Sequence, residues 1–149
     1  MGKKRVVVQK TETILKESEK LESVFRAGLK LKPLKLPKGR LYISSSYNNT
    51  LLTLTDQKGN TIFFSSAGRV GFSGTKKGTP FAATQAAKLM AMAIKYLQIQ
   101  ELDVFVKGIG QGRSAALRTL ASENINIVSI KDVTPIPHDG CRPPKVRRT

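Results

Sequence analysis

The stretch LYISSSYNNTLLTLTDQKGNTIFFS, Leu41 to Ser65, carries the pattern from which the fold can be worked out. It contains three short runs of strand-forming residues, separated by Asn48-Asn49 and by Gln57 to Asn60. Residues of these types tolerate the positive φ that tight hairpins demand. The stretch therefore predicts a three-stranded antiparallel meander, with strands over Leu41 to Ser46, Leu51 to Thr55 and Thr61 to Ser65.

The sequence that follows alternates between helical and strand patterns. Thr79-Pro80 supplies a helix cap and a residue pre-set for the first helical position. Apolar residues then recur at spacings of three and four as far as Leu97. A strand over Leu102 to Val106, a helix over Arg113 to Glu123 and a strand over Ile125 to Ile130 are expected next. The order βββαβαβ predicts an α/β fold with a mixed five-stranded sheet, because right-handed crossovers make part of the sheet parallel.

Charge divides the 149 residues into three zones. Residues 1–40 carry 12 basic and 4 acidic residues, residues 41–133 carry 10 and 5, and residues 134–149 carry 4 and 1. We therefore predict a basic N-terminal extension (1–40), a globular RNA-binding domain (41–133) and a basic, Pro-rich C-terminal tail (134–149). In the extension, an amphipathic helix is expected over Thr13 to Leu29, followed by an extended stretch with Pro33 and Pro37.

The net charge of +16 predicts a polyanionic partner. Nucleic acid and an acidic membrane surface would both attract this charge, and nucleic acid adds counterion release. No run approaches the ~18 apolar residues of a spanning helix. The lone Cys141 excludes an internal disulfide and fits a reducing compartment. Neither a secretory signal nor a transit pattern is visible after Met1, so a cytoplasmic location is expected.

The segment VKGIGQGR, Val106 to Arg113, lies between a strand and a helix, where a phosphate-binding turn would lie. It has neither the third glycine of a dinucleotide fingerprint nor the Gly-Lys-Ser/Thr ending of a P-loop. Two interpretations keep equal weight. One is a sharp turn that needs flexible backbone; the other is close approach of an RNA phosphate to a helix N-terminus beside Arg113.

Catalytic and metal chemistry find little support in the sequence. His138 and Cys141 have a metal-like spacing, but a structural zinc needs four ligands and there is no second His or Cys. No serine has a credible base. We therefore expect no catalytic residue, metal, cofactor or small-molecule substrate. The acids that a metal-dependent nuclease would need fall at the ends of different elements: Asp56, Glu101, Asp103, Glu123 and Asp132.

The loop SAGRVGFSGTKKGTPFAATQAA, Ser66 to Ala87, carries the strongest RNA signal. Its glycines permit close backbone approach, its hydroxyls are short donors, and Arg69, Lys76 and Lys77 supply phosphate contacts. A merely solvated loop would explain the charge but not the glycine density. Most phenylalanines and Tyr47 are expected at core positions, so recognition should rest on shape and backbone, with stacking a minor mode.

Three stretches together resemble the eleventh protein family of the small ribosomal subunit, in its bacterial form. They are SYNNTLLTLTDQKGN (Ser46 to Asn60), AGRVGFSGTKKGTPFAA (Ala67 to Ala83), and VKGIGQGR with DVTPIPHDGCRPPKVRRT (Asp132 to Thr149). The resemblance covers roughly Gly39 to Thr149. It implies a three-layer, ribonuclease-H-like fold without that enzyme's activity. Departures from the family pattern are Arg69 for a glycine, Ile109 and Gln111 for prolines, and Asp139 for an asparagine.

The resemblance also implies a place in the cytoplasmic ribosome, on the small-subunit platform, where the protein would bridge rRNA helices and help form the Shine-Dalgarno cleft. The implied partners are small-subunit rRNA, the seventh and eighteenth small-subunit proteins and initiation factor three. The candidate rRNA-binding residues are Asn48, Asn49, Arg69, Ser73, Lys76, Lys77, Thr79, Lys107, Gly110, Arg113, His138, Arg142, Lys145, Arg147 and Arg148.

Asp139-Gly140 is a candidate isoaspartate site, because the unshielded Gly140 nitrogen can attack the Asp139 carboxyl carbon. An ordinary Asp-Gly turn is the favoured alternative. Two other functions fit some of the same sequence features. A free RNA chaperone or nucleoid-type binder would share the charge but not the closing motif, and a metal-dependent nuclease is more distant.

Overall fold

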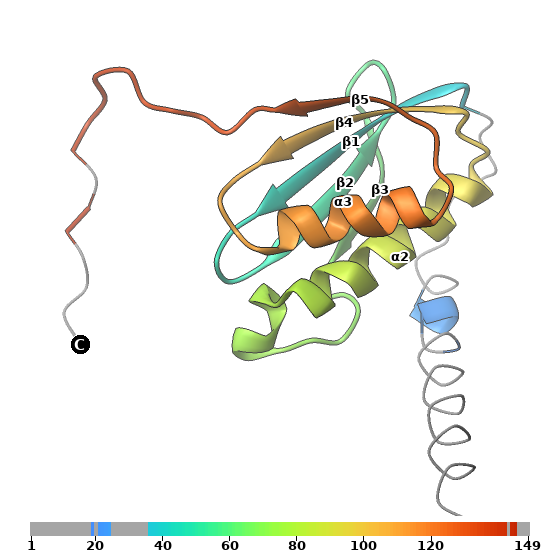
Figure 1. The fold of residues 1–149 in the computed structure, drawn as a ribbon, viewed down its shortest axis with the longest axis horizontal. Helices are drawn as coiled ribbons and strands as arrows, with labels where there is room; N and C mark the ends of the chain where they lie inside the picture. Colours follow the sequence, from blue (N-terminus) through green and yellow to red (C-terminus); the bar gives the residue numbers. More distant parts are fainter. Residues whose placement is uncertain (1–18, 20, 25–35, 143, 146–149) are drawn as a thin grey trace, which may run out of the picture.

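The structure is a computed structural model that describes residues 19, 21–24, 36–142 and 144–145. The elements are β1 (Lys38–Ser45), β2 (Thr50–Thr55), β3 (Thr61–Ser66), the 3-10 helix η1 (Gly74–Gly78), α2 (Pro80–Tyr96), β4 (Glu101–Lys107), α3 (Gly112–Ser122) and β5 (Ile127–Asp132). Figure 1 shows the sheet with α2 and α3 packed along it. The predicted order βββαβαβ is confirmed.

The five strands form one mixed sheet in the order β3-β2-β1-β4-β5. The meander pairs antiparallel, whereas β1 with β4 and β4 with β5 are parallel. The predicted α/β class and mixed five-stranded sheet are therefore confirmed, and they agree with a ribonuclease-H-like fold. The described residues supply its sheet and the helical layer on one face.

Strand boundaries differ from the expected ones where pairing is long-range. β1 begins at Lys38, three residues before the expected start at Leu41, because Lys38 and Gly39 pair with Glu101 and Leu102 of β4. The run of strand-forming residues begins only after Gly39, but pairing with the parallel strand β4 extends β1 back to Lys38. The last strand begins at Ile127, later than expected, after Asn124 adopts a left-handed φ of 56°.

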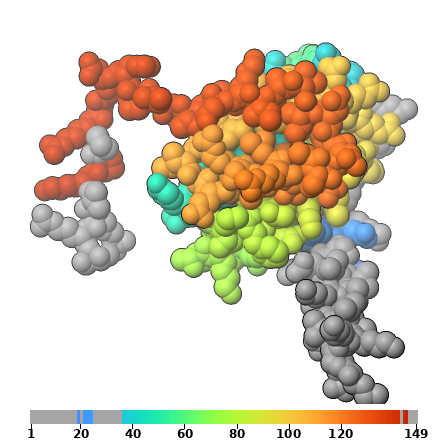
Figure 2. Space-filling view, in the orientation of Figure 1, coloured from blue at the N-terminus to red at the C-terminus, as the bar shows by residue number. Residues whose placement is uncertain are grey.

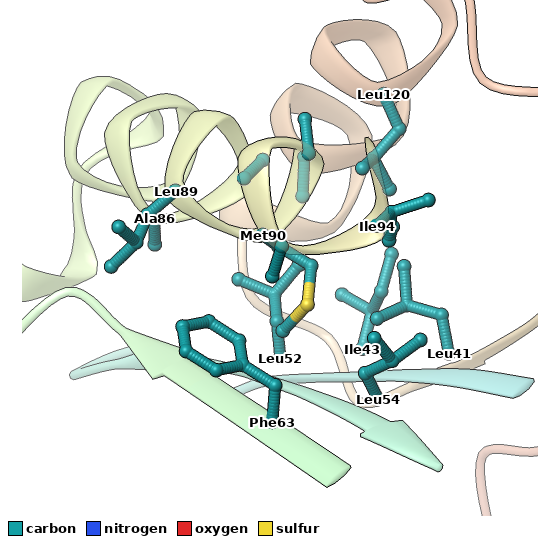
Figure 3. Close-up of a cluster of buried hydrophobic side chains, with 14 of the residues drawn as sticks. Leu41, Ile43, Leu52, Leu54, Phe63, Ala86, Leu89, Met90, Ile94 and Leu120 are labelled. Carbon is teal, nitrogen blue, oxygen red and sulfur yellow. The ribbon is translucent and has the colours of Figure 1, made fainter. Parts of the chain in front are cut away.

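The core lies between the sheet and the two helices (Figure 3). Alternate residues of the central strands point into it, among them Leu41, Leu52 and Val104, each fully buried. α2 buries six alanines, whose small side chains let the helix pack closely against its neighbours. Burying one large aliphatic side chain contributes ~1.5–3 kcal/mol, so this layer accounts for much of the stability.

The expected N-terminal helix falls mostly outside the described residues. Glu19 and Leu21 to Val24 are described and are helical. Leu21 is buried and joins the hydrophobic core, with Val24 packed against it. The extended stretch expected around Pro33 also lies outside the described residues up to residue 35.

Candidate nucleic-acid interface

The carboxyl ends of four strands meet at one edge of the sheet. β1, β4 and β5 run in one direction, and β3 shares it because two antiparallel pairings separate β3 from β1. This edge therefore carries the hairpin turn 46–49, the loop 67–79, the turn 108–111 and the start of the tail at residue 133. We call it the loop edge. It gathers all the loops in which the sequence predicts rRNA contacts.

The hairpin turn from Ser46 to Asn49 is the centre of the loop edge. Ser46 N donates to Asn49 O over 2.9 Å, and Asn49 N donates to Ser46 Oγ over 3.2 Å. Asn49 Oδ1 accepts from Thr50 N at 2.9 Å, which fixes the asparagine side chain. Asn48 is exposed at the turn. Of the two predicted contact residues, Asn49 thus shapes the turn and Asn48 faces solvent.

Glycines from two other loops pack against this turn. A Cβ added at Gly78 would lie 2.2 Å from Tyr47 O, and one at Gly108 would lie 2.2 Å from Ser45 O. Side-chain carbons do not approach so closely, so the backbones can meet only where the side chain is absent. These glycines therefore hold three loops together at the loop edge.

The turn 108–111 uses its glycines in the same way. A Cβ at Gly110 would lie 2.3 Å from Ser46 O, and Gly110 N donates to Ser45 O over 3.1 Å. The sharp-turn interpretation of VKGIGQGR accounts for these contacts. A contact between Gly110 and rRNA stays a prediction. Lys107, at the end of β4, is exposed.

The loop 67–79 presents cations beside the N-terminus of α2. Thr79 caps that helix, since its Oγ1 accepts from Ala82 N at 3.3 Å and donates to Lys76 O at 2.8 Å. Lys76 and Ser73 are exposed and Lys77 is half-buried. A helix N-terminus favours anions, so the two lysines and the helix act on a phosphate in the same sense.

Arg69 is engaged within the protein, although the sequence predicts a phosphate contact for it. Its Nη1 donates to Phe64 O over 2.9 Å. The guanidinium carbon lies 4.7 Å from the Phe64 ring centroid and 5.1 Å from that of Phe63. The side chain thus covers aromatic rings by cation–π contact while part of it stays exposed.

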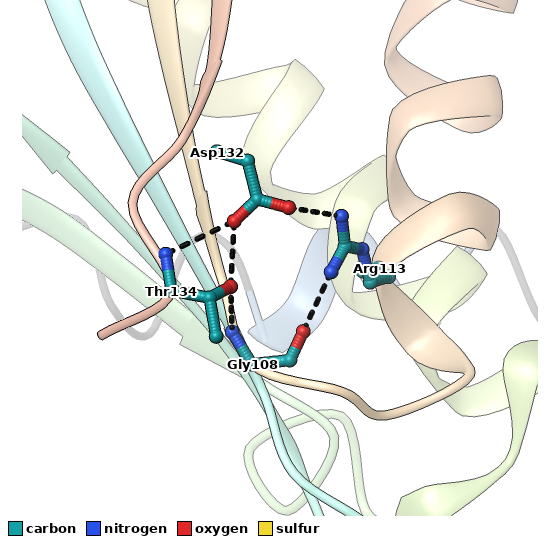
Figure 4. Close-up of polar contacts among 4 residues, drawn as sticks. All are labelled: Gly108, Arg113, Asp132 and Thr134. Carbon is teal, nitrogen blue, oxygen red and sulfur yellow. Dashed lines mark hydrogen bonds and ion pairs between the residues drawn. The ribbon is translucent and has the colours of Figure 1, made fainter. Parts of the chain in front are cut away.

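Arg113 joins α3 to the start of the tail (Figure 4). Its Nη1 donates to Gly108 O over 2.8 Å, and its Nη2 lies 2.5 Å from Asp132 Oδ2. Asp132 Oδ1 accepts from both Thr134 Oγ1 and Thr134 N, at 2.6 and 3.0 Å. Thr134 Oγ1 in turn accepts from Gly108 N. We call these four residues the latch.

Hydrogen bonds stabilise the charged form of Asp132. The Thr134 hydroxyl contributes most, followed by the Thr134 amide and Arg113, and together they lower the pKa of Asp132 to about 2. Arg113 therefore has an anionic partner at neutral pH. If Arg113 binds an rRNA phosphate as predicted, its guanidinium would contact both that phosphate and Asp132.

The tail leaves the loop edge and extends away from the domain, as Figure 2 shows in red. Its described residues from Pro135 to Lys145 are exposed, including His138, Asp139, Arg142 and Lys145. Asp139 adopts a left-handed φ of 50°. The other two candidates, Arg147 and Arg148, lie outside the described residues.

The expectation that the aromatics are mostly core residues is wrong. Phe63 is buried, but the exposed fractions are 54% for Phe64, 54% for Phe81 and 75% for Tyr47. Sequence reasoning also missed Tyr42, which is 37% exposed. The signal was present as strand alternation, because Phe64 follows the inward-facing Phe63 and must point the other way.

The acids of the central zone are dispersed, as their positions in the sequence predict. Each has a separate partner: Asp56 with Asn60, Glu101 with Lys38, Asp103 with Ser129, Glu123 with Lys95, and Asp132 with Arg113. Within residues 19, 21–24, 36–142 and 144–145, no three His, Cys, Asp or Glu side chains gather at a metal-binding distance. In the same part of the chain, no helix is long and apolar enough to span a membrane.

A mixed α/β sheet with exposed lysines on joined loops and a basic tail defines a small protein of the polyanion-binding class. Residues 39–148 match the family model described as ribosomal protein S11. The small ribosomal subunit protein uS11 of Endomicrobium trichonymphae is 50% identical over 73% of this chain and 83% of its own length. The uS11c protein of Cyanidioschyzon merolae is 54% identical over 74% of this chain and 92% of its own length.

The chain belongs to the ribosomal protein S11 family. The resemblance that the three sequence stretches indicate is thereby confirmed. The chain has a structural role in the small ribosomal subunit and is not an enzyme. Its predicted location in the ribosome, a complex of the cytoplasm, is confirmed as well.

Proposed function

We propose that this protein binds and bridges rRNA helices on the platform of the small subunit and helps form the Shine-Dalgarno cleft. The observation that supports this most is the loop edge. Four strand ends bring the hairpin turn, the loop 67–79, the turn 108–111 and the tail to one side of the molecule. Exposed cations at separate points of this edge, such as Lys76 in η1 and Lys107 at the end of β4, can reach different RNA backbones at once.

The contacts at this edge would act mainly on phosphates. Lys76 and Lys77 flank the N-terminus of α2, and Arg142 and Lys145 lie on the extended tail. Each phosphate that a cation neutralises releases counterions, so binding should weaken steeply with salt. In the subunit, the seventh and eighteenth small-subunit proteins and initiation factor three are the proposed neighbours.

Salt dependence tests the phosphate contacts directly. Binding of the full chain to a small-subunit rRNA fragment would be measured over a range of KCl concentrations. Lys76→Ala with Lys77→Ala should reduce the slope of log K against log salt by about one unit per charge. Arg147→Ala with Arg148→Ala should act alike. Lys58→Ala is the matched control, because Lys58 lies in the β2–β3 turn at the opposite end of the sheet.

An unchanged slope in both double variants would contradict phosphate binding at the loop edge.

Sedimentation separates the ribosomal role from that of a free RNA chaperone. The ribosomal role requires that the protein migrate with small subunits after a high-salt wash. Protein–RNA crosslinks on those subunits would then show whether the loop edge contacts more than one rRNA helix.

A further inference from the structure

One row of side chains crosses the sheet on the face opposite α2 and α3. The strand register pairs Phe64 with Thr53, and Thr53 with Tyr42. It then pairs Tyr42 with Phe105, and Phe105 with Lys131. Residues paired on neighbouring strands point to the same face. We call Phe64, Thr53, Tyr42, Phe105 and Lys131 the aromatic row.

The rings of this row are accessible. Phe64 is 54% exposed and Tyr42 is 37% exposed, while Phe105 is half-buried. Tyr42 and Phe105 stack on each other with ring centroids 5.0 Å apart and an interplanar angle of 16°. Phe64 and Tyr42 lie two strand spacings apart, or ~10 Å. A solvent-facing sheet normally carries polar side chains, so this concentration of aromatics needs a reason.

Cations surround the row on the same face. Arg40 lies two residues before Tyr42 on β1, and Lys107 lies two residues after Phe105 on β4. Lys131 closes one end of the row. At the other end the Arg69 guanidinium carbon lies 4.7 Å from the Phe64 ring centroid. Both ends of the row thus carry positive charge.

The carboxylates on this face already have partners. Glu101 Oε2 lies 2.6 Å from Lys38 Nζ, and Asp103 Oδ1 accepts from Ser129 Oγ over 2.5 Å. Asp103 lies opposite Arg40 in the strand register and offsets part of its charge. Lys107, Lys131 and Arg69 leave this face with an excess of positive charge. A protein partner would favour an interface core depleted of charge. Rings bordered by cations instead suit unpaired nucleotides, which offer flat bases and phosphates together.

We propose that the aromatic row is a stacking platform for unpaired bases of single-stranded RNA, with Arg40, Lys107 and Lys131 on the adjoining phosphates. This rests on the proposed function, since it takes RNA as the ligand, and it adds recognition of bases to that of phosphates. The Tyr42–Phe105 pair alone could serve to stabilise the sheet as a cross-strand pair. That role explains neither the exposed Phe64 nor the cations around it.

Two single-stranded oligonucleotides of equal length and charge test the platform. One carries uracil bases throughout, and the other has abasic riboses at its central positions. The full-length protein should bind the base-bearing strand roughly tenfold more tightly, as stacking of one base predicts. Tyr42→Leu with Phe105→Leu should remove this preference and leave the salt slope unchanged. Tyr96→Leu, which replaces a ring on α2 that is 41% exposed, should keep the preference.

The outcomes separate the platform from the proposed function. Equal binding of both strands by the wild-type protein, or a preference that survives the double variant, would overturn the platform and leave phosphate binding intact. Binding of neither strand would also overturn the platform, whereas the proposed function would fail only if the rRNA fragment were not bound either. A second measurement needs no variant: 4-thiouridine oligonucleotides should crosslink to the peptides that hold Tyr42, Phe64 and Phe105. Crosslinks confined to residues 74–79 and the tail would also overturn the platform.

Discussion

At the scale of single residues, two glycines with the same backbone conformation have different surroundings. Gly59 has a φ of 94° and Gly108 a φ of 97°, both in a region that side chains rarely adopt. A Cβ at Gly59 would meet nothing within 4 Å, whereas one at Gly108 would lie 2.2 Å from Ser45 O. The pair therefore separates the cost of the conformation from the cost of close approach.

We predict that Gly59→Ala lowers the free energy of unfolding by about 1–3 kcal/mol, the usual cost of such a backbone conformation. Gly108→Ala should cost clearly more, because the turn 108–111 must also move away from β1. Because the total stability of a domain is typically ~5–15 kcal/mol, we expect Gly108→Ala to be partly unfolded. Urea denaturation of both variants measures the difference. Equal losses would mean that the contact with Ser45 does not constrain the turn.

Asp139 is the residue for which chemistry and conformation together suggest a modification. The residue is exposed and has a φ of 50°, and Gly140 follows it. We predict that in some molecules Gly140 N attacks the Asp139 side-chain carboxyl carbon with loss of water. Hydrolysis of the resulting succinimide at its other carbonyl yields isoaspartate, and the mass returns to its original value. The added backbone methylene would change the direction of Arg142 and the tail.

Isoaspartyl methyltransferase labels the product and not normal aspartate. The peptide from intact small subunits should therefore take up label at Asp139. Gly140→Val is the control, because a branched side chain shields the attacking nitrogen and should suppress the labelling. Unlabelled peptide from mature subunits would leave only the ordinary turn.

At the scale of elements, the latch shows what local sequence patterns cannot supply. Periodicity, turn residues and a helix cap predicted the strands and α-helices, because each of these signals lies within its own segment. The contact of Arg113 with Asp132 spans 19 residues, and Gly108 meets Ser45 across 63. Such partners become visible only once the parallel pairing of β1, β4 and β5 places their ends together. The sequence predicted the five strands and the two α-helices, but neither η1 nor which glycines pack against which loop. The candidate rRNA-binding residues stay predictions.

The latch has a pH dependence whose sign follows from Asp132. Its pKa in the folded protein is about 2, below the ordinary value of 3.8. A depressed carboxyl pKa contributes stability that is fully present above the unfolded pKa and is lost as the pH falls through about 2. We therefore predict that the latch stays closed from neutral pH down to about pH 3 and opens below it.

Thr134 tests the cause of this shift, because its hydroxyl contributes most to it. Thr134→Val should move the pKa of Asp132 upward, toward its ordinary value, whereas Thr134→Ser should keep it near 2. A carbon-13 NMR titration of the Asp132 carboxyl between pH 1.5 and about 5 reads both. If Thr134→Val leaves the pKa unchanged, Arg113 rather than the hydroxyl holds the carboxylate.

At the scale of the whole molecule, the positive net charge opposes folding but favours RNA binding. The chain carries a net charge of +16, of which the two ends, residues 1–40 and 134–149, hold +11. Like charges repel across the folded protein and weaken its compact state. RNA relieves that repulsion by supplying phosphates. An increase in ionic strength should therefore stabilise the free protein and destabilise its complex with RNA.

We predict that raising KCl from about 0.05 to 0.5 M raises the melting temperature of the free protein, because the Debye length falls from ~14 to ~4 Å and repulsion is screened. Each kcal/mol gained corresponds to about 2–4 °C for a chain of this size. The rRNA complex should lose stability over the same range as counterion release becomes less favourable. Calorimetry of both species measures how each melting temperature changes with salt.

Lys76→Gln with Lys77→Gln removes two neighbouring cations of η1 and should make both melting temperatures less sensitive to salt. A melting temperature of the free protein that falls with salt would mean that attractive ion pairs, such as Lys38 with Glu101 and Lys95 with Glu123, outweigh the repulsion.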